Sequence, residues 1–133
     1  MPPTETKSSP DCPFCEEQLK DTVVGSYGSM VAVLDRHPVT EGHHLIITRR
    51  HVDDYFRLSA TERADMDHLL RILKNKIEKE DPSVTGFNIG VNIGASAGQT
   101  VFHVHIHLIP RRDGDTPDPR GGVRGVIPGK RSY

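Results

Sequence analysis

The chain has 133 residues, of which 35% are hydrophobic and 26% are charged, and its formal net charge is −1. That length suits a single domain, and the hydrophobic share is too large for a chain dominated by disorder. The near-neutral charge argues against general attraction to a nucleic-acid polymer, so a phosphate-bearing ligand would be held by local groups. No stretch reaches the roughly 20 apolar residues of a membrane span, and residues 1–10 lack the apolar centre of a signal peptide, so we expect a cytoplasmic protein with no membrane partner.

The first half of the chain predicts a polar tail, a hairpin and a central strand. Residues 1–10 combine Pro, Ser, Thr and charged residues without periodicity, which predicts a disordered tail. From Thr22 to Asp35, β-branched and small residues surround the turn-forming Gly25–Gly28 region, which predicts a β-hairpin. The apolar run from His43 to Thr48 is typical of a central strand.

The second half predicts one long helix and two further strands. Ser59 and Glu62 form a capping-box pattern, and apolar residues then recur at helical spacing up to Asp81. Strands are expected over residues 85–93 and 100–109, on either side of a glycine-rich loop, and the proline after the second strand is expected to stop it.

Together these elements predict an α+β domain over residues 11–112, with a mostly antiparallel sheet of about five strands and one main helix packed on it. Residues 113–133 are rich in Gly, Pro, Arg and Asp, which predicts an irregular C-terminal tail across the surface. Val123 and the Val126–Ile127 pair are the candidate anchors of this tail.

Three histidines alternate with apolar residues in the segment from Phe102 to Ile109. With a strand period of two, His103, His105 and His107 would project from one face, roughly 6.5–7 Å apart, while the apolar residues point to the other. Three interpretations stay open for such a row: a polar strand face, a metal cluster, or covalent catalysis by an imidazole nucleophile. Three histidines in register favour a chemical role over simple filling of a polar face.

The segment from His103 to Ile109 resembles the His-x-His-x-His-x-x signature of the histidine-triad (HIT) superfamily. The similarity runs from roughly Cys12 to Arg112 and includes these further positions: Leu34-Asp35, Gly42-His43, Ile46-Ile47, His51, Asn88–Asn92 and Gly98–Thr100. The resemblance implies the HIT-like fold and a small-molecule nucleotide as substrate. It also implies a homodimer, in which an exposed sheet edge would be covered.

The resemblance implies roles for three histidines. In the family the middle histidine of the signature attacks the phosphorus next to the nucleoside, so His105 is expected to be the nucleophile and to form a transient nucleotidyl adduct. His43 and His107 match family residues that hold or protonate phosphate oxygens, where donors stabilise the charge that builds in the transition state. His44 is expected to point to the opposite face of the sheet and receives no role.

Four further positions match the substrate contacts of the family. Asp35 stands where the family holds ribose hydroxyls, which suits a carboxylate acceptor. Asn92 matches a polar contact near the ribose and the phosphates, and Gln99 and Thr100 match residues that meet phosphate or leaving-group oxygens. The loop from Gly94 to Gln99 is expected to offer backbone N–H groups to phosphate.

Cys12 and Cys15 have the spacing of a metal or redox pair, and no βαβ pattern of a redox domain surrounds them. Zinc-carrying members of the superfamily complete four ligands with the histidine after the central strand and the first triad histidine, which are His51 and His103 here. The resemblance therefore implies one structural zinc per chain, held by two thiolates and two imidazoles. His103 would then brace the strand that carries His105.

The sequence leaves the branch of the superfamily open. The chain has no Trp, whereas the phosphoramidate hydrolases end in a short tail with a Trp, and its residues 119–124 resemble bacterial members. From Arg111 onward six basic residues stand against three aspartates, which favours a dinucleoside polyphosphate such as diadenosine tetraphosphate. Adenosine phosphoramidate hydrolysis is the alternative activity, and a non-catalytic nucleotide-binding regulatory module and a zinc-storage protein are the alternatives of other classes.

Overall fold

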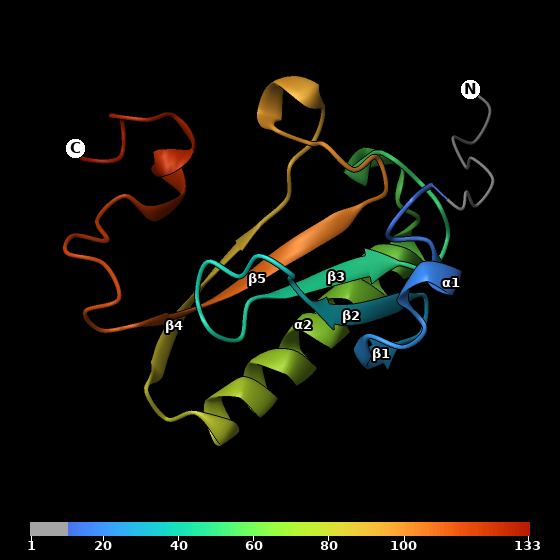
Figure 1. Ribbon diagram of the computed structural model, residues 1–133, viewed down its shortest axis with the longest axis horizontal. Helices are drawn as coiled ribbons and strands as arrows, with labels where there is room; N and C mark the ends of the chain where they lie inside the picture. Colours follow the sequence, from blue (N-terminus) through green and yellow to red (C-terminus); the bar gives the residue numbers. More distant parts are fainter. Residues whose placement is uncertain (1–10) are drawn as a thin grey trace.

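The computed structural model describes residues 11–133, so the tail expected over residues 1–10 lies outside the described residues. Five strands form one sheet in the order β1-β2-β3-β5-β4, and every neighbouring pair is antiparallel (Figure 1). The strands and helices are β1 (Val23–Tyr27), β2 (Met30–Leu34), β3 (His44–Thr48), β4 (Val84–Gly90), β5 (His105–Arg112), α1 (Glu16–Leu19) and α2 (Ala60–Glu80). The predicted α+β class, five-stranded antiparallel sheet and single main helix are confirmed.

Helix α2 begins where the sequence predicts. The Ser59 hydroxyl accepts from the N–H of Glu62, and the Glu62 carboxylate accepts from the N–H of Ser59, so the capping box is complete. The helix ends at Glu80, because the residue before a proline avoids helical geometry and Asp81 precedes Pro82. Within residues 11–133, no helix combines the length and the apolar character needed to cross a membrane.

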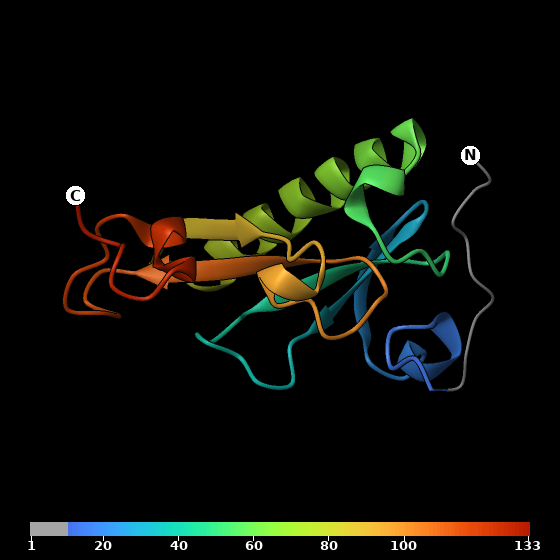
Figure 2. The same cartoon turned by 90° about the horizontal axis from the view of Figure 1, so that it is seen from above.

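The two faces of the sheet are covered unequally. Helix α2 lies along one face, and α1 lies with the β2–β3 loop on the other (Figure 2). Strand alternation sends one set of side chains toward α2, where the main core includes Met30, Ala32, Ile46, Leu69, Leu73, Ile106 and Leu108. A smaller cluster on the α1 face consists of Leu19, Val31, Val33, Leu45 and Ile47. The α1 face therefore keeps room for a site beside its small core.

The histidine-bearing strand differs from the prediction. β5 begins at His105, so His103 lies before the strand and the expected row of three histidines on one strand is wrong. The strand also continues through Pro110 to Arg112 rather than stopping at the proline. A proline is tolerated there because pairing with β3 ends at Leu108, which leaves one side of β5 open.

The C-terminal segment after β5 is mostly irregular, with one short 3-10 helix, η3 (Gly122–Val126), beside β4 (Figure 1). The expected anchors Val123, Val126 and Ile127 are 63%, 75% and 58% exposed, so the expectation that they anchor the tail is wrong. Ion pairing between Arg111 and Asp115 instead fixes the turn that follows β5.

Candidate active site and metal centre

A cleft of about 360 Å³ opens on the α1 face of the sheet. Its polar lining includes His105 and His107 from β5, Asp35 after β2, and Thr100. The apolar part of its lining includes Phe14, Leu19, Val33, Leu45 and Val101. A concave, mostly apolar wall with a few convergent polar groups is the usual form of a small-molecule site.

His105 presents a ring nitrogen with a free lone pair to this cleft. Its Nδ1 lies 2.8 Å from the carbonyl oxygen of His103, and because that oxygen can only accept, Nδ1 carries the hydrogen. The neutral ring then has its lone pair on Nε2. The ring of Phe14 lies edge-on to the imidazole, with 4.8 Å between the centroids, and restricts its rotation.

A second pair of histidines lies beside His105. Nε2 of His43, just before β3, is 2.9 Å from Nδ1 of His107. The Oδ2 atom of Asp35 lies 3.5 Å from the former and 4.0 Å from the latter. Burial lowers the pKa of both His43 and His107, so the pair is neutral near pH 7.

His44 points away from this group, as the sequence predicts. It lines a different cavity together with Lys76 and Glu80 of α2, and its ring nitrogen Nδ1 bonds the carbonyl oxygen of Gly42. The side chains of His43 and His44 therefore lie on opposite faces of the sheet.

The four expected substrate contacts do not share one cavity. Asp35 and Thr100 line the cleft with His105, and the Oδ1 atom of Asp35 accepts from the N–H of His37 at 2.7 Å. This bond holds the Asp35 carboxylate in place while Oδ2 faces the His43–His107 pair. Asn92 lines a second cavity, of about 620 Å³, that also borders His43 and His107.

Gln99 is buried and its side chain is engaged within its own loop. Its Oε1 accepts from the N–H of Gly94 at 2.9 Å, and its Nε2 donates to the carbonyl of Asp53 at 2.8 Å. The backbone N–H groups of residues 97–99 also donate within the loop, around the 3-10 helix η2 (Ala95–Ala97). The expected row of free N–H groups for phosphate is therefore wrong at these four amides, and Gln99 shapes the loop.

Cys12, Cys15, His51 and His103 converge on one point, and their ligand atoms all lie within 4.8 Å of one another. The two Nδ1 atoms are 3.1 Å apart. The sulfur-to-Nδ1 separations are 3.1 Å from Cys15 to His51, 3.4 Å from Cys12 to His103 and 3.8 Å from Cys15 to His103. A tetrahedral zinc with bonds of about 2.3 Å to sulfur and about 2.05 Å to nitrogen has ligand-to-ligand edges of roughly 3.3–3.8 Å. These separations are within a few tenths of an ångström of those edges, so the four side chains could hold a single tetrahedral ion.

The electrostatics of this cluster also suit a metal. His103 is fully buried, which lowers its pKa to about 4 and keeps the ring neutral. Its Nε2–H donates to the carbonyl of Thr48 at 2.7 Å, so the lone pair is on Nδ1, the atom that faces the cysteines. Burial raises the pKa of the Cys12 thiol, and a bound cation is the group that would stabilise its thiolate.

Comparison with known proteins identifies the fold. The family model of the HIT domain matches residues 16–114, which is most of the chain. The chain belongs to the HIT family. The family resemblance inferred from the histidine signature is thereby confirmed.

Two relatives of this HIT protein carry functional names. It is 39% identical over 85 residues to adenylylsulfatase HINT3 of Arabidopsis thaliana, an alignment that covers 64% of this chain and 43% of that protein. It is 34% identical over 119 residues to AP-4-A phosphorylase of Mycobacterium tuberculosis, which covers 83% of this chain and 58% of that protein. The chain thus spans about half the length of these two relatives.

Solved HIT structures match most of this chain. A HIT family protein from Bacillus anthracis superposes with a TM-score of 0.71 at 34% identity, over 81% of this chain and 78% of that one. A Zn-bound histidine triad family protein from Mycobacterium smegmatis superposes with a TM-score of 0.70 at 31% identity, over 81% of this chain and 84% of that one.

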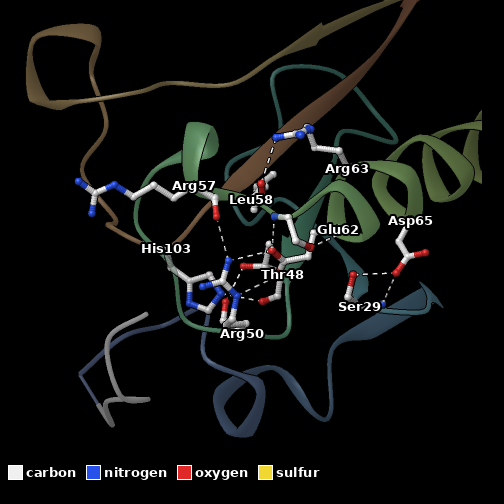
Figure 3. Close-up of polar contacts among 10 residues, drawn as sticks. Ser29, Thr48, Arg50, Arg57, Leu58, Glu62, Arg63, Asp65 and His103 are labelled. Carbon is white, nitrogen blue, oxygen red and sulfur yellow. Dashed lines mark hydrogen bonds and ion pairs between the residues drawn. The ribbon is translucent and has the colours of Figure 1, made fainter. Parts of the chain in front are cut away.

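In this HIT domain a chain of polar contacts links His103 of the Cys/His cluster to α2 (Figure 3). The carbonyl of Thr48 accepts from His103, and the Thr48 hydroxyl donates to the carbonyl of Arg50 at 2.7 Å. The Arg50 guanidinium donates twice to the carboxylate of Glu62, at 2.8 and 3.1 Å. Sequence reasoning found Glu62 only as a helix cap and gave no role to Arg50, which lies two residues after the buried strand β3.

Proposed function

We propose that this HIT protein is a nucleotide hydrolase or transferase that cleaves at the α-phosphate of a nucleotide conjugate. The observation that carries the proposal is the Nε2 lone pair of His105, fixed by the carbonyl of His103 in a cleft shared with Asp35. A neutral imidazole is a competent nucleophile toward phosphorus and can split one displacement into two. The names of the two relatives, an adenylylsulfatase and an AP-4-A phosphorylase, support a nucleotide conjugate as the substrate class.

The two steps use the residues of the cleft as follows. Nε2 of His105 attacks the α-phosphorus, the leaving group departs with its electron pair, and a nucleotidyl-imidazole remains. Water or another acceptor then attacks the same phosphorus and restores the free ring. The carboxylate of Asp35 accepts hydrogen bonds from ribose hydroxyls, and His107, held by its contact with the ring of His43, stabilises the phosphoryl oxygens. Thr100 contacts phosphate or leaving-group oxygens at the mouth of the cleft.

We propose that the Cys12, Cys15, His51 and His103 cluster holds one structural zinc. Two thiolates and two imidazoles complete a closed tetrahedral set, and the Zn-bound neighbour from M. smegmatis supports the identity of the metal. When bound, the ion would hold the segment after β3, which carries His51, against the segment before β5, which carries His103. With four protein ligands it would have no open coordination position. The residues of this chain that do the chemistry are those of the cleft.

Among nucleotide conjugates, two cavities favour a dinucleoside polyphosphate such as diadenosine tetraphosphate. His107 borders both the 360 Å³ cleft and the 620 Å³ cavity, so phosphates that cross His107 can leave a nucleoside on each side. The second cavity includes apolar and amide groups that suit a base, among them Val39, Asn88, Ile89, Asn92 and Val126. Adenosine phosphoramidate needs the first cleft alone and is the alternative substrate.

The homodimer stays a prediction, which light scattering on the purified chain tests.

The test compares the wild type with His105→Ala, and with His68→Ala as an exposed-histidine control on α2, outside the cleft. Each protein is incubated with diadenosine tri- and tetraphosphate, adenosine phosphoramidate and nucleoside-sugar diphosphates, and products and intact mass are read from the same quenched samples. We expect the wild type and the control to release a nucleoside monophosphate and to gain a nucleotidyl mass that His105→Ala never shows. Equal inactivity of all three proteins, with nucleotide still bound, would instead support the non-catalytic regulatory module.

A further inference from the structure

The ring of His43 is held between a backbone donor and a second imidazole. The N–H of Val39, in the loop between β2 and β3, donates to Nδ1 of His43 at 3.2 Å. A backbone N–H can only donate, so this Nδ1 is an acceptor and carries no hydrogen. The neutral ring of His43 therefore has its single hydrogen on Nε2.

The hydrogen on Nε2 of His43 also fixes the tautomer of His107. Nε2 of His43 lies 2.9 Å from Nδ1 of His107, so the hydrogen on the former makes the latter an acceptor. The single hydrogen of a neutral His107 is then on Nε2, at the edge of the ring away from His43. The opposite order would put a ring hydrogen of His43 against the N–H of Val39, and two donors would face each other at 3.2 Å.

The charged form of His43 meets the same obstacle, because an imidazolium carries hydrogens on both nitrogens. The groups around His43 and His107 shift the pKa of the two rings in opposite directions. Burial is the main cause that lowers the pKa of His43 and His107, and the neighbouring histidines His44 and His105 lower it further. The Asp35 carboxylate raises the pKa of both rings but does not outweigh burial.

We propose that the backbone N–H of Val39 sets the tautomers of the His43–His107 pair, so that a neutral His107 offers Nε2–H as a hydrogen-bond donor. Val39 acts through His43 and is a positioning residue. A neutral imidazole that gives up its only hydrogen becomes an anion, so His107 holds a phosphoryl oxygen and does not protonate the leaving group. The identity of that oxygen rests on the proposed function, whereas the tautomers do not.

The tautomer of His43 also bears on whether a second cluster can bind a metal. Asp35, His43 and His107 bring three potential ligand atoms within 4.8 Å of one another, which is a geometry that could suit a metal. A metal would need the lone pair of His43 on Nε2, and the N–H of Val39 directs that lone pair to Nδ1. The cluster is therefore built to present the Nε2–H of His107 as a hydrogen-bond donor, in contrast to the cysteine-containing cluster.

The direct test is long-range ¹H–¹⁵N correlation NMR on protein labelled at histidine, with signals assigned through single His→Gln variants. The method distinguishes a ring nitrogen that carries a hydrogen from one that does not. We expect His43 and His107 to be Nε2–H tautomers and His105 to be the opposite one, Nδ1–H, which serves as an internal reference. A hydrogen on Nδ1 of His43 would overturn the proposal, whatever the enzyme assays show.

The second test removes the backbone N–H of residue 39 and keeps both histidines. Val39→Pro lacks the backbone N–H, and Val39→Ala is the matched control that retains it; both variants replace the valine side chain, so the difference between them reports the loss of the N–H. We expect Val39→Pro to lower kcat about 10- to 100-fold with KM within about threefold, since an oriented donor acts mainly in the transition state. In the same variant a hydrogen should appear on Nδ1 of His43.

Equal kcat and equal tautomers in the proline and alanine variants would overturn the proposal. If the proline variant does not fold, an ester in place of the 38–39 peptide bond removes the same N–H without fixing the backbone. A wild type as inert as His105→Ala would refute the proposed function, and the NMR result on the wild type would still decide the tautomers.

Discussion

Replacing Glu62 with alanine should destabilise the protein markedly, although the residue lies outside the cleft. The Glu62 side chain is only 7% exposed and accepts three hydrogen bonds, one from the N–H of Ser59 and two from the guanidinium of Arg50. The substitution removes half of the capping box and leaves a guanidinium that is three-quarters buried without its carboxylate. Breaking a buried ion pair costs about 3–5 kcal/mol, and partial exposure of Arg50 places the expected loss near the lower end.

The measurement is urea unfolding followed by far-UV circular dichroism, with Glu78→Ala as the control in the same helix. Glu78 pairs with Lys74 at an exposed site, where such pairs contribute only about 0.3–0.5 kcal/mol. We expect a loss of about 3 kcal/mol for Glu62→Ala and less than about 0.5 kcal/mol for the control. A loss below about 1 kcal/mol for Glu62→Ala would refute the reasoning, since it would mean that the contacts contribute no more than surface ones.

The dependence of this difference on pH has a definite sign. Burial alone would raise the pKa of Glu62, but the hydrogen bonds from Arg50 and Ser59 outweigh it, and the pKa lies below its ordinary value of 4.5. A lowered pKa contributes stability above the unfolded value, and this stability is lost as the pH falls through the folded value. The gap between the wild type and Glu62→Ala should therefore be widest near neutral pH and should shrink below about pH 4.5.

Three further changes test other parts of the structure. Cys15→Ser should lower the bound zinc, measured by plasma mass spectrometry, from about one per chain to a small fraction, because three ligands no longer close the tetrahedron; an unchanged metal content would contradict the assigned site. Asp35→Asn should raise KM about 10- to 100-fold with a smaller effect on kcat, since hydrogen bonds to a charged group contribute about 1.5–3 kcal/mol, and an unchanged KM would remove Asp35 from ribose binding. Gly28→Ala should cost about 1–2 kcal/mol in urea unfolding, because Gly28 has φ +53° and an added Cβ would clash with the Asp65 carboxylate; a variant as stable as the wild type would show that Asp65 moves freely.

The sequence predicts those elements whose residues carry a local signal. The capping box at Ser59 and Glu62 places the start of α2, and the glycines near Gly28 place the hairpin turn between β1 and β2. The HIT signature identifies the family, because three histidines at a fixed spacing are a rare pattern. What these features share is that residues close in sequence determine them.

The remaining features depend on contacts between distant parts of the chain. Alternation along the histidine run says nothing of where pairing with β3 begins, so the sequence could not place His103 before β5 or Pro110 inside it. Gln99 matches a substrate contact by position, yet its amide bonds Asp53, a partner far away in sequence. The proton positions on His43 and His107 follow from a backbone N–H at Val39, which no side-chain pattern reveals.

The ring and the backbone carbonyl of His103 have separate roles. Its ring faces the cysteines, while its backbone carbonyl orients the ring of His105. A carbonyl is present in every amino acid, so substituting His103 would remove a proposed metal ligand without removing the acceptor that fixes the His105 tautomer. The proposed metal site and the proposed nucleophile are therefore separable: a chain that lacks the four metal-binding side chains can keep the same backbone acceptor for the ring of His105.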